Sequence, residues 1–450
     1  MKKIGQILRN KEIMGRIMFT ILILFVFRIG AQITVPGVQI TGDLQGYLTS
    51  NNALALMNIL GGGTIQTFSI FALGVSPYIT AQIIVSLLAT DVLPALTELK
   101  RQGQYGRKKM EMATRYLTLM LGAVQAYGII QTLRSADASY ITFNVGQYEW
   151  LTYIYVIVVM MAGSMLVMWL GDQISVKGIG NGISMIIFAG IVCSLPTQIM
   201  TAFNQWIGTS LGTGKELTGV FQFLLYILAY LLIISFVTFI ELAKRKIPVQ
   251  HSGKGGQTQS MAKASFLPIK VNSAGVIPVI FASSIMMAPS VIVAFVAPEH
   301  TNDSWLGIFN SSVLFDMNGF KMPWGLLIYI VLIIAFCFFY ANIQINPQEL
   351  AENFQKNGSY IPGIRPGNET ERYVKKVLNR VTCIGAIALA FIAALPPILT
   401  MSGVFGSNTS LALGGTGLII IVGVALELNS QIDGLLAGKS FDEVVASGGR

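Results

Sequence analysis

The sequence predicts an all-α integral membrane protein that crosses the bilayer about ten times. Three observations predict this fold class. Of the 450 residues, 53% are hydrophobic and only 11% are charged, whereas soluble proteins carry roughly 25% charged residues. The mean hydropathy is +0.65. Long stretches such as 273–298 and 381–426 contain no charged residue, and each exceeds the ~20 residues with which a helix crosses the hydrocarbon core.

Ten apolar stretches have the length and composition of transmembrane helices. They are residues 17–35, 70–90, 114–133, 151–171, 180–202, 219–240, 273–297, 323–343, 374–399 and 411–429. The preceding segment, 1–16, is basic and amphipathic, which is typical of a short helix on the membrane surface. The first stretch is too long for the apolar region of a signal peptide and lacks a clear small-residue cleavage site, so we interpret it as the first span and insertion signal.

The basic residues divide sharply when the segments between the spans are numbered alternately inside and outside, starting inside. Of the 30 lysine and arginine residues, 26 then fall on inside segments or at the inside ends of spans. Only Arg134, Lys215 and Lys321 fall outside, and Arg28 alone lies within a span. Because cytoplasmic segments retain lysine and arginine, both termini are predicted to be cytoplasmic. The resulting basic cytoplasmic face also suits anionic lipid or an RNA-rich partner.

The outside loop 203–218 divides the chain into two parts of five spans each. The N-terminal part is 17–202, the C-terminal part is 219–429, and a cytoplasmic tail, 430–450, follows. Two such halves favour an inverted repeat with a functional site at their interface, an expectation that rests on the number of spans alone.

Two cytoplasmic loops, 241–272 and 344–373, are far longer than the ~2–8 residues of ordinary helix connections. Long loops on a rigid scaffold often bind partners. The second loop contains the stretch Tyr360–Gly367, in which two prolines and two glycines predict successive turns that hold Arg365 outward. An ordinary turn with a solvated arginine is the alternative.

Residues 44–69 are apolar but do not have the pattern of a span. They are interrupted by glycines and asparagines, including Asn58, Gly61, Gly62 and Gly63. Irregular backbone at membrane depth requires burial in protein or a watery cavity. An outside loop that touches the membrane surface is equally compatible with the composition, so both interpretations remain open at this point.

The polar residues argue against a catalytic or solute-binding site at membrane depth. Apart from Arg28, the charged residues in or beside the spans lie near the span ends. The sequence places no Ser-His or paired-carboxylate arrangement at membrane depth. The three cysteines, Cys193, Cys337 and Cys383, lack the spacing of a metal site and are interpreted as small buried side chains. The sequence therefore predicts a protein that is not an enzyme and has no cofactor or metal.

Seven motifs resemble the SecY family of protein-conducting channel subunits, in the family's order and over essentially the whole chain. They are Val26–Gly30, Phe71–Thr80, Met168–Asp172, Gly178–Ser184, Leu267–Pro278, Ile361–Gly367 and Gly414–Thr416. The resemblance implies two pseudo-symmetric five-helix halves around an hourglass pore. Unfolded secretory polypeptides would pass through this pore across the plasma membrane, and transmembrane segments would leave it sideways into lipid.

The resemblance also assigns roles to residues. It implies an apolar pore ring of Val75, Ile79, Ile183, Ile187, Ile280 and Ile420. A narrow ring of such side chains excludes ions because it binds none of them and offers no hydrogen bond. Ordinary helix packing is the alternative for each of these residues. The resemblance further implies that residues 44–69, with Asn58 and Gly61, Gly62 and Gly63, form a plug and a re-entrant half-helix.

A lateral gate is implied between spans two and three on one side and seven and eight on the other. Thr80 and Gln125 match polar gate positions, with a plain helix–helix hydrogen bond as the alternative. The partner-binding loops would present Arg245, Lys246, Lys254 and Arg365. Implied partners are SecE-like and SecG-like small membrane subunits, the SecA ATPase, the ribosome, secretory and membrane protein precursors, and membrane lipid.

Two features depart from the family. Loop 250–266 is poor in arginine, and Gly417 stands where a serine is usual. The leading hypothesis is a translocation pore whose energy comes from partners. A secondary transporter of small solutes is second, because it requires an ionisable or densely polar site at the membrane midplane, and an intramembrane enzyme is third.

Overall fold

A computed structural model of the chain describes most of the 450 residues. The described residues are 10–41, 44, 58, 61–89, 94–135, 140–143, 149–208, 216–251, 265–296, 304–309, 315–317, 320–402 and 415–448. Within them, eight helices are long and apolar enough to cross a membrane. These are α2 (Lys11–Gly30), α7 (Gln104–Ser135), α8 (Glu149–Lys177), α9 (Gly182–Phe203), α10 (Glu216–Leu242), α12 (Trp324–Gln344), α14 (Asn368–Ser402) and α15 (Gly415–Gly448).

Two further apolar helices, α5 (Ser76–Leu88) and α11 (Ile277–Val296), lie at the second and seventh predicted spans. Each of the ten predicted ranges therefore contains a helix, and the all-α membrane fold is confirmed. Shorter elements complete the described chain: α6 (Pro94–Arg101), the π-helical turn η1 (Asn204–Gly208), the 3-10 turn η4 (Ser304–Phe309) and α13 (Pro347–Lys356).

Several helix ends differ from the predicted span limits. Helix α2 already begins at Lys11, so the end of the predicted surface segment belongs to the same helix as the first span. Helix α14 begins at Asn368, and α15 continues to Gly448 through most of the predicted tail. Hydropathy detects only the part of a helix that lies in lipid, whereas the helix itself continues into polar residues that favour it equally well.

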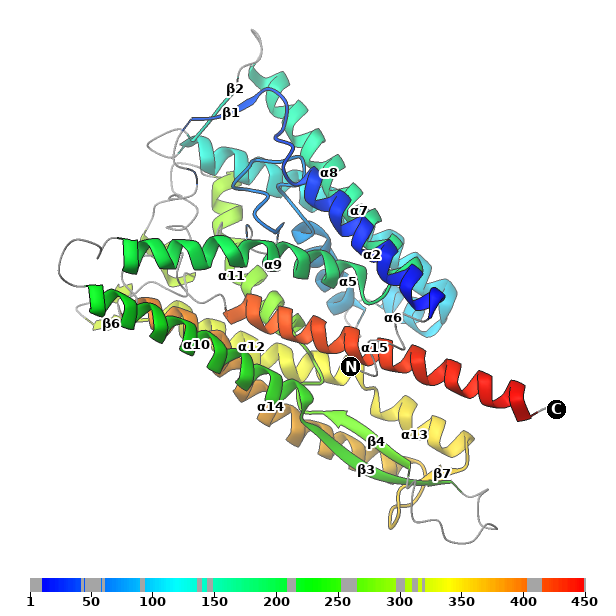
Figure 1. The fold of residues 1–450 in the computed structure, drawn as a ribbon. Helices are drawn as coiled ribbons and strands as arrows, with labels where there is room; N and C mark the ends of the chain where they lie inside the picture. The colour runs from blue at the N-terminus through cyan, green and yellow to red at the C-terminus, as the bar shows by residue number, and fades with distance from the viewer. Residues whose placement is uncertain are drawn as a thin grey trace.

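The helices form two groups that follow the two halves of the sequence (Figure 1). In the first group α2 contacts α8 and α9, α5 contacts α7, and α7 contacts α8. In the second group α12 contacts α11 and α14, and α10 and α14 contact α15. Among the described residues, the groups touch where α9 packs against α15, where α11 packs against α5 and α7, and where Phe203 at the end of α9 packs against Phe223 of α10. The interface between the halves is therefore lined by α5, α7, α9, α10, α11 and α15.

The two long loops predicted from sequence fold together at one end of the helices (Figure 1). Strands β3 (Lys244–His251) and β4 (Ser265–Lys270) pair antiparallel, and β7 (Ser359–Tyr360) pairs with the end of β3. Their inner side chains Ile247 and Ile269 pack with Ile361 and with Leu378 of α14 in one buried cluster. At the base, the Asn272 amide donates a hydrogen bond to the carboxylate of Glu241, and both residues are buried. The described parts of both loops are thus structured and pack against the helices.

Two small strand pairs lie at the opposite end of the helices (Figure 1). Strand β1 (Val38–Ile40) pairs antiparallel with β2 (Ile141–Phe143). Strand β5 (Phe315–Met317) pairs antiparallel with β6 (Phe320–Met322).

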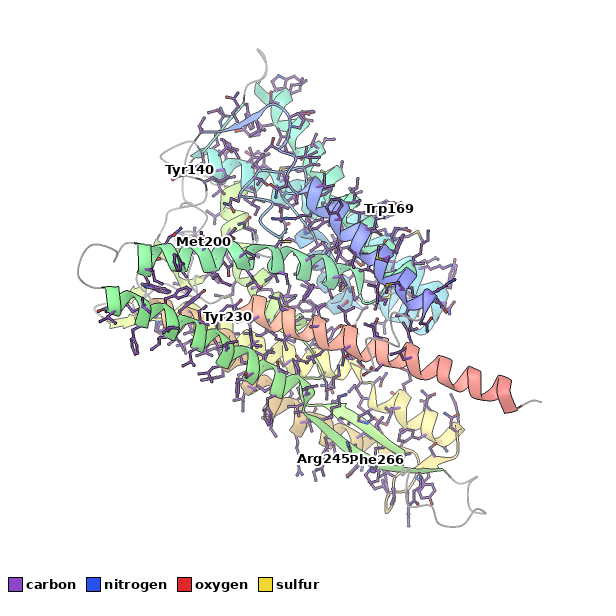
Figure 2. All side chains as sticks on the ribbon, viewed as in Figure 1. Tyr140, Trp169, Met200, Tyr230, Arg245 and Phe266 are labelled. Carbon is purple, nitrogen blue, oxygen red and sulfur yellow. The ribbon has the colours of Figure 1, made fainter. Side chains whose placement is uncertain are left out.

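The outer faces of the helices carry large exposed apolar side chains. Phe25 on α2, Trp169 on α8 and Leu232 on α10 are each more than half exposed, and Figure 2 shows Trp169 on the outside of α8. Exposure of such side chains to lipid costs no hydrophobic free energy, because lipid is as apolar as the interior of the protein.

Candidate functional site

The six predicted ring residues meet in one hydrophobic cluster, which we call the waist cluster: Val75, Ile79, Ile183, Ile187, Ile280 and Ile420. All but Ile183 are buried, with exposed fractions between 2% and 8%, and Ile183 packs against the others while partly buried. They come from α5, α9, α11 and α15, so both helix groups contribute. The structure therefore brings together residues that are up to several hundred positions apart in the sequence.

Local sequence explains how α5 and α9 present the cluster. Val75 is the N-cap of α5, and Pro77 follows inside the first turn, where its fixed backbone angle suits a helix start. Val75 and Ile79 are four residues apart, as are Ile183 and Ile187, so each pair lies on one helix face.

The turn before α9 is built for a short connection from α8. The Asn181 side chain caps α9 by accepting hydrogen bonds from the backbone N–H groups of Ile183 and Ser184, at 3.1 and 3.4 Å. Gly182 lies against the Gly171 carbonyl so closely that a Cβ would overlap it. At Gly417 a Cβ would lie 3.2 Å from Ile191 Cγ2, so the glycine that departs from the family pattern lets α15 approach α9.

The chemistry of the waist cluster is that of a seal. All six side chains are β-branched aliphatic groups, which neither bind ions nor replace the hydrogen bonds of water. Within the described residues, no three histidine, cysteine or acidic side chains lie close enough together to hold a metal ion. The described cluster therefore offers no polar group that could bind an ion or water.

Residues 61–75 form an irregular, buried segment beside the waist. Thr64, Ile65, Phe68 and Ser69 have exposed fractions of 1% or less. Backbone hydrogen bonds tie the segment to the end of α2: Val35 N donates to Phe68 O and Ile70 N donates to Ile33 O, each at 3.0 Å. Of the two interpretations that composition left open for 44–69, the described part supports burial within the protein. Most of the predicted plug, 45–57 and 59–60, lies outside the described residues.

The predicted plug residues that the structure describes form a closed loop. Asn58 Oδ1 accepts hydrogen bonds from Ile65 N and Gln66 N at 3.1 and 3.2 Å, and Asn58 O accepts one from Gly63 N at 2.7 Å. Gly62 and Gly63 adopt left-handed backbone angles, φ 77° and 85°, which glycine adopts without strain.

Two tertiary contacts of this loop were not predicted from the sequence. Gly62 lies against Gly190 of α9, and a Cβ on either glycine would be 2.6 Å from the other's Cα. The guanidinium of Arg28, the basic residue within a span, donates a hydrogen bond to Gly62 O at 2.8 Å. The sequence signals that pointed to this place were the lone arginine within an apolar stretch and the glycines at 61–63.

The two predicted gate residues do not bond to each other. The Thr80 hydroxyl donates to Ser76 O one turn earlier in its own helix, at 3.0 Å. Gln125 Oε1 is buried and has no hydrogen-bond partner in the described part of the chain. Their helices, α5 and α7, nevertheless both contact α11 of the other group, so the two residues lie on helices that border the second interface between the halves.

The predicted partner-binding residues that the structure describes are exposed. Arg245 and Lys246 lie on β3, and Figure 2 labels Arg245 and Phe266 on the β3–β4 hairpin, where they pair with Ile269 and Pro248. Arg365 lies between two left-handed glycines, Gly363 and Gly367. Its backbone carbonyl accepts a hydrogen bond from the Thr370 hydroxyl at 2.9 Å, so the turn is held as predicted. Lys254 lies outside the described residues.

Fold and site together define a multi-pass helical membrane protein whose two helix groups meet at a buried aliphatic cluster. The sequence model of the SecY family matches residues 69–429. The "Protein translocase subunit SecY" of Mycoplasma capricolum is 41% identical, over 97% of this chain and 89% of that protein. The protein of the same name from Lactococcus lactis strain IL1403 is 40% identical, over 98% and 97%. The chain belongs to the SecY family.

Solved structures share the fold. The structure described as that of a protein conducting channel has a TM-score of 0.64 at 19% identity, with 94% of this chain and 92% of that chain covered. The channel of a canine ribosome–channel complex from the endoplasmic reticulum gives a TM-score of 0.61 at 18% identity, with the same coverage. The overall arrangement of the helices is thus that of known channels.

Proposed function

We propose that this chain is the pore-forming subunit of a protein-conducting channel. It passes unfolded secretory polypeptides across the plasma membrane and releases transmembrane segments into lipid. The observation that carries the proposal is the waist cluster, in which both helix groups contribute aliphatic side chains to one buried cluster. Such a ring yields to a chain of any sequence, because it makes no specific polar contact, yet it excludes ions at rest. Membership of the SecY family supports the same function.

The remaining residues take roles that follow from this function. Residues 44–69 form the plug, α5 and α7 with Thr80 and Gln125 border the lateral gate against α11, and Arg245, Lys246, Lys254 and Arg365 bind cytoplasmic partners. The partners are SecE-like and SecG-like small subunits, the SecA ATPase, the ribosome, precursor proteins and lipid. A yeast channel complex of the same fold, TM-score 0.56, is bound to a ribosome, which supports the ribosome as a partner. The chain itself catalyses no reaction, and its partners supply the energy.

A transporter of small solutes is the second candidate and is less well supported. Such a protein needs ionisable groups free to bind a solute or ion at membrane depth. The basic group found there, that of Arg28, already donates to Gly62 O.

Reconstitution tests the proposal. Proteoliposomes that contain the chain with its small subunits, supplied with SecA, ATP and a secretory precursor, are expected to protect the precursor from added protease. Liposomes without the chain are the control. Protease sensitivity of the precursor in both preparations, together with uptake of a small solute by the chain alone, would favour the transporter.

Orientation is tested by cysteine labelling. We expect both termini in the cytoplasm, because 26 of the 30 basic residues lie on that side of the predicted topology. In a variant without Cys193, Cys337 and Cys383, a cysteine at the exposed Thr142 of β2 should react with an impermeant thiol reagent in intact cells. Cysteines at the exposed Gln104 and Asn357 should react only after the cells are opened. The reverse pattern would show the opposite orientation.

A further inference from the structure

Arg28 has an unusual hydrogen-bond partner for a charged side chain within a span. It is half-buried in α2, within the apolar stretch that precedes Gly30, and among the described residues its guanidinium pairs with no carboxylate. Its Nη1 instead donates to a backbone oxygen, Gly62 O, at 2.8 Å. A charged side chain at membrane depth is costly and is kept there by a specific role. The role must therefore concern the loop that contains Gly62.

That loop is held from two sides. Arg28 bonds it from α2, and Gly190 of α9 touches Gly62 without any intervening side chain. The hydrogen bonds from Ile65 and Gln66 to Asn58 make residues 61–66 one compact unit, so the two contacts act on the whole loop. Because α9 also supplies Ile183 and Ile187, the position of the loop is coupled to the waist cluster.

The same loop contains a group that opposes its burial. The Thr64 side chain is fully buried, and its Oγ1 has no hydrogen-bond partner among the described residues. A buried hydroxyl without a partner costs free energy that is recovered when water reaches it. The bond from Arg28 and the unpaired hydroxyl of Thr64 therefore act in opposite directions on the buried position of the loop.

We propose that Arg28 is a positioning residue that holds residues 61–66 against α9 and so sets how readily the channel opens. The inference rests on the proposed channel function and assigns its regulation to a bond outside the waist cluster. A hydrogen bond from a cation to a neutral carbonyl is weaker than one to a carboxylate. The contact therefore holds the loop in the resting channel and can break when the channel opens. The unpaired hydroxyl of Thr64 lowers the stability of the loop in this buried position.

Resting ion conductance in planar bilayers tests the contribution of Arg28. Arg28→Met, which removes the donor, is expected to raise the conductance of the resting channel about tenfold. Arg28→Lys, which keeps a charge and a donor but not the reach of the guanidinium, should fall between Arg28→Met and the unaltered chain. Arg16→Met is the matched control, because Arg16 lies on the same helix and pairs only with the exposed Glu12 at 3.2 Å. Conductance of Arg28→Met equal to that of the control overturns the proposal.

Two further variants disturb the loop without touching Arg28. Gly190→Ala places a methyl group against Gly62 and should also raise resting conductance, whereas Gly15→Ala, with open space around it, should not. Thr64→Val replaces the unpaired hydroxyl with a methyl group. It should therefore lower the resting conductance and slow channel opening. General destabilisation of the protein moves all variants in one direction, so a leak increase in Thr64→Val contradicts the opposing roles.

A chemical readout separates this inference from the channel function. In a chain without the native cysteines, Thr64→Cys should react slowly with a thiol reagent, because position 64 is buried. Addition of Arg28→Met should accelerate the reaction about tenfold, and addition of Arg16→Met should leave it unchanged. Equal reaction rates of Thr64→Cys with Arg28→Met and of Thr64→Cys with Arg16→Met overturn the inference, even if the channel conducts. Failure of the reconstituted chain to protect a precursor overturns the channel function, while the labelling rates still decide whether Arg28 holds the loop.

Discussion

Replacing Ile187 and Ile280 together by asparagine is expected to make the resting channel leak ions. The two residues come from α9 and α11, one from each helix group, and both are buried in the waist cluster. An asparagine amide buried without a partner costs roughly 2–7 kcal/mol, so the closed waist would admit water to satisfy it. Because 1.4 kcal/mol is a factor of about ten in an equilibrium constant, a rise in resting conductance of about tenfold or more is expected in planar bilayers.

Two controls separate the seal from helix packing. Ile187→Val with Ile280→Val keeps the ring aliphatic and β-branched, so it should stay closed despite the lost methyl groups. Leu232→Asn places the same amide on an outward, exposed face of α10 and should not alter conductance. If the asparagine pair in the waist conducts no more than these controls, the six residues merely pack helices.

Much of the fold could be predicted because the membrane constrains it. Each of the ten apolar stretches contains a helix, since lipid leaves a spanning segment no other way to satisfy its backbone. One of the boundaries that differ is informative. The second span was expected from residue 70, but its helix starts at Ser76, because residues 61–75 satisfy their backbone through tertiary contacts such as Ser164 Oγ donating to Gly74 O. Hydropathy does not register such contacts.

The candidate site could be predicted only with the help of the family resemblance. Ile187 and Ile280 do not differ in composition or periodicity from packing isoleucines such as Ile333, which is buried in a different cluster. The contact of Gly62 with Gly190 left no sequence signal, since both positions are simply glycine among many. Arg28 was visible as an isolated charge, but its partner, a backbone oxygen 34 positions away, has no side-chain identity that a pattern could reveal.

Changing Arg365 to glutamate is expected to block motor-driven transport while leaving the channel assembled. Arg365 is exposed in a turn whose backbone is held by Gly363, Gly367 and the hydrogen bond from Thr370. Such rigidity lowers the ordering entropy that a partner must overcome on binding. The guanidinium presents its donors in a planar fork that fits carboxylates and backbone carbonyls of a protein and phosphates of RNA. Glutamate reverses the charge and removes every donor, so SecA-driven precursor transport into inverted vesicles should fall about tenfold or more.

The comparison with lysine and with a neighbouring arginine shows whether the contact is specific. Arg365→Lys keeps the charge but loses the planar fork, so its transport rate should lie between those of the unaltered chain and Arg365→Glu. Arg372→Glu changes the net charge equally at another exposed position, on the first turns of α14, and should transport nearly normally. If Arg365→Glu and Arg372→Glu reduce the transport rate equally, the loop acts through its net charge alone. Because Arg365 points into solvent from a turn that packs through Ile361 rather than through the arginine, the variants should assemble in normal amounts, and a lost rate then reports a lost partner contact.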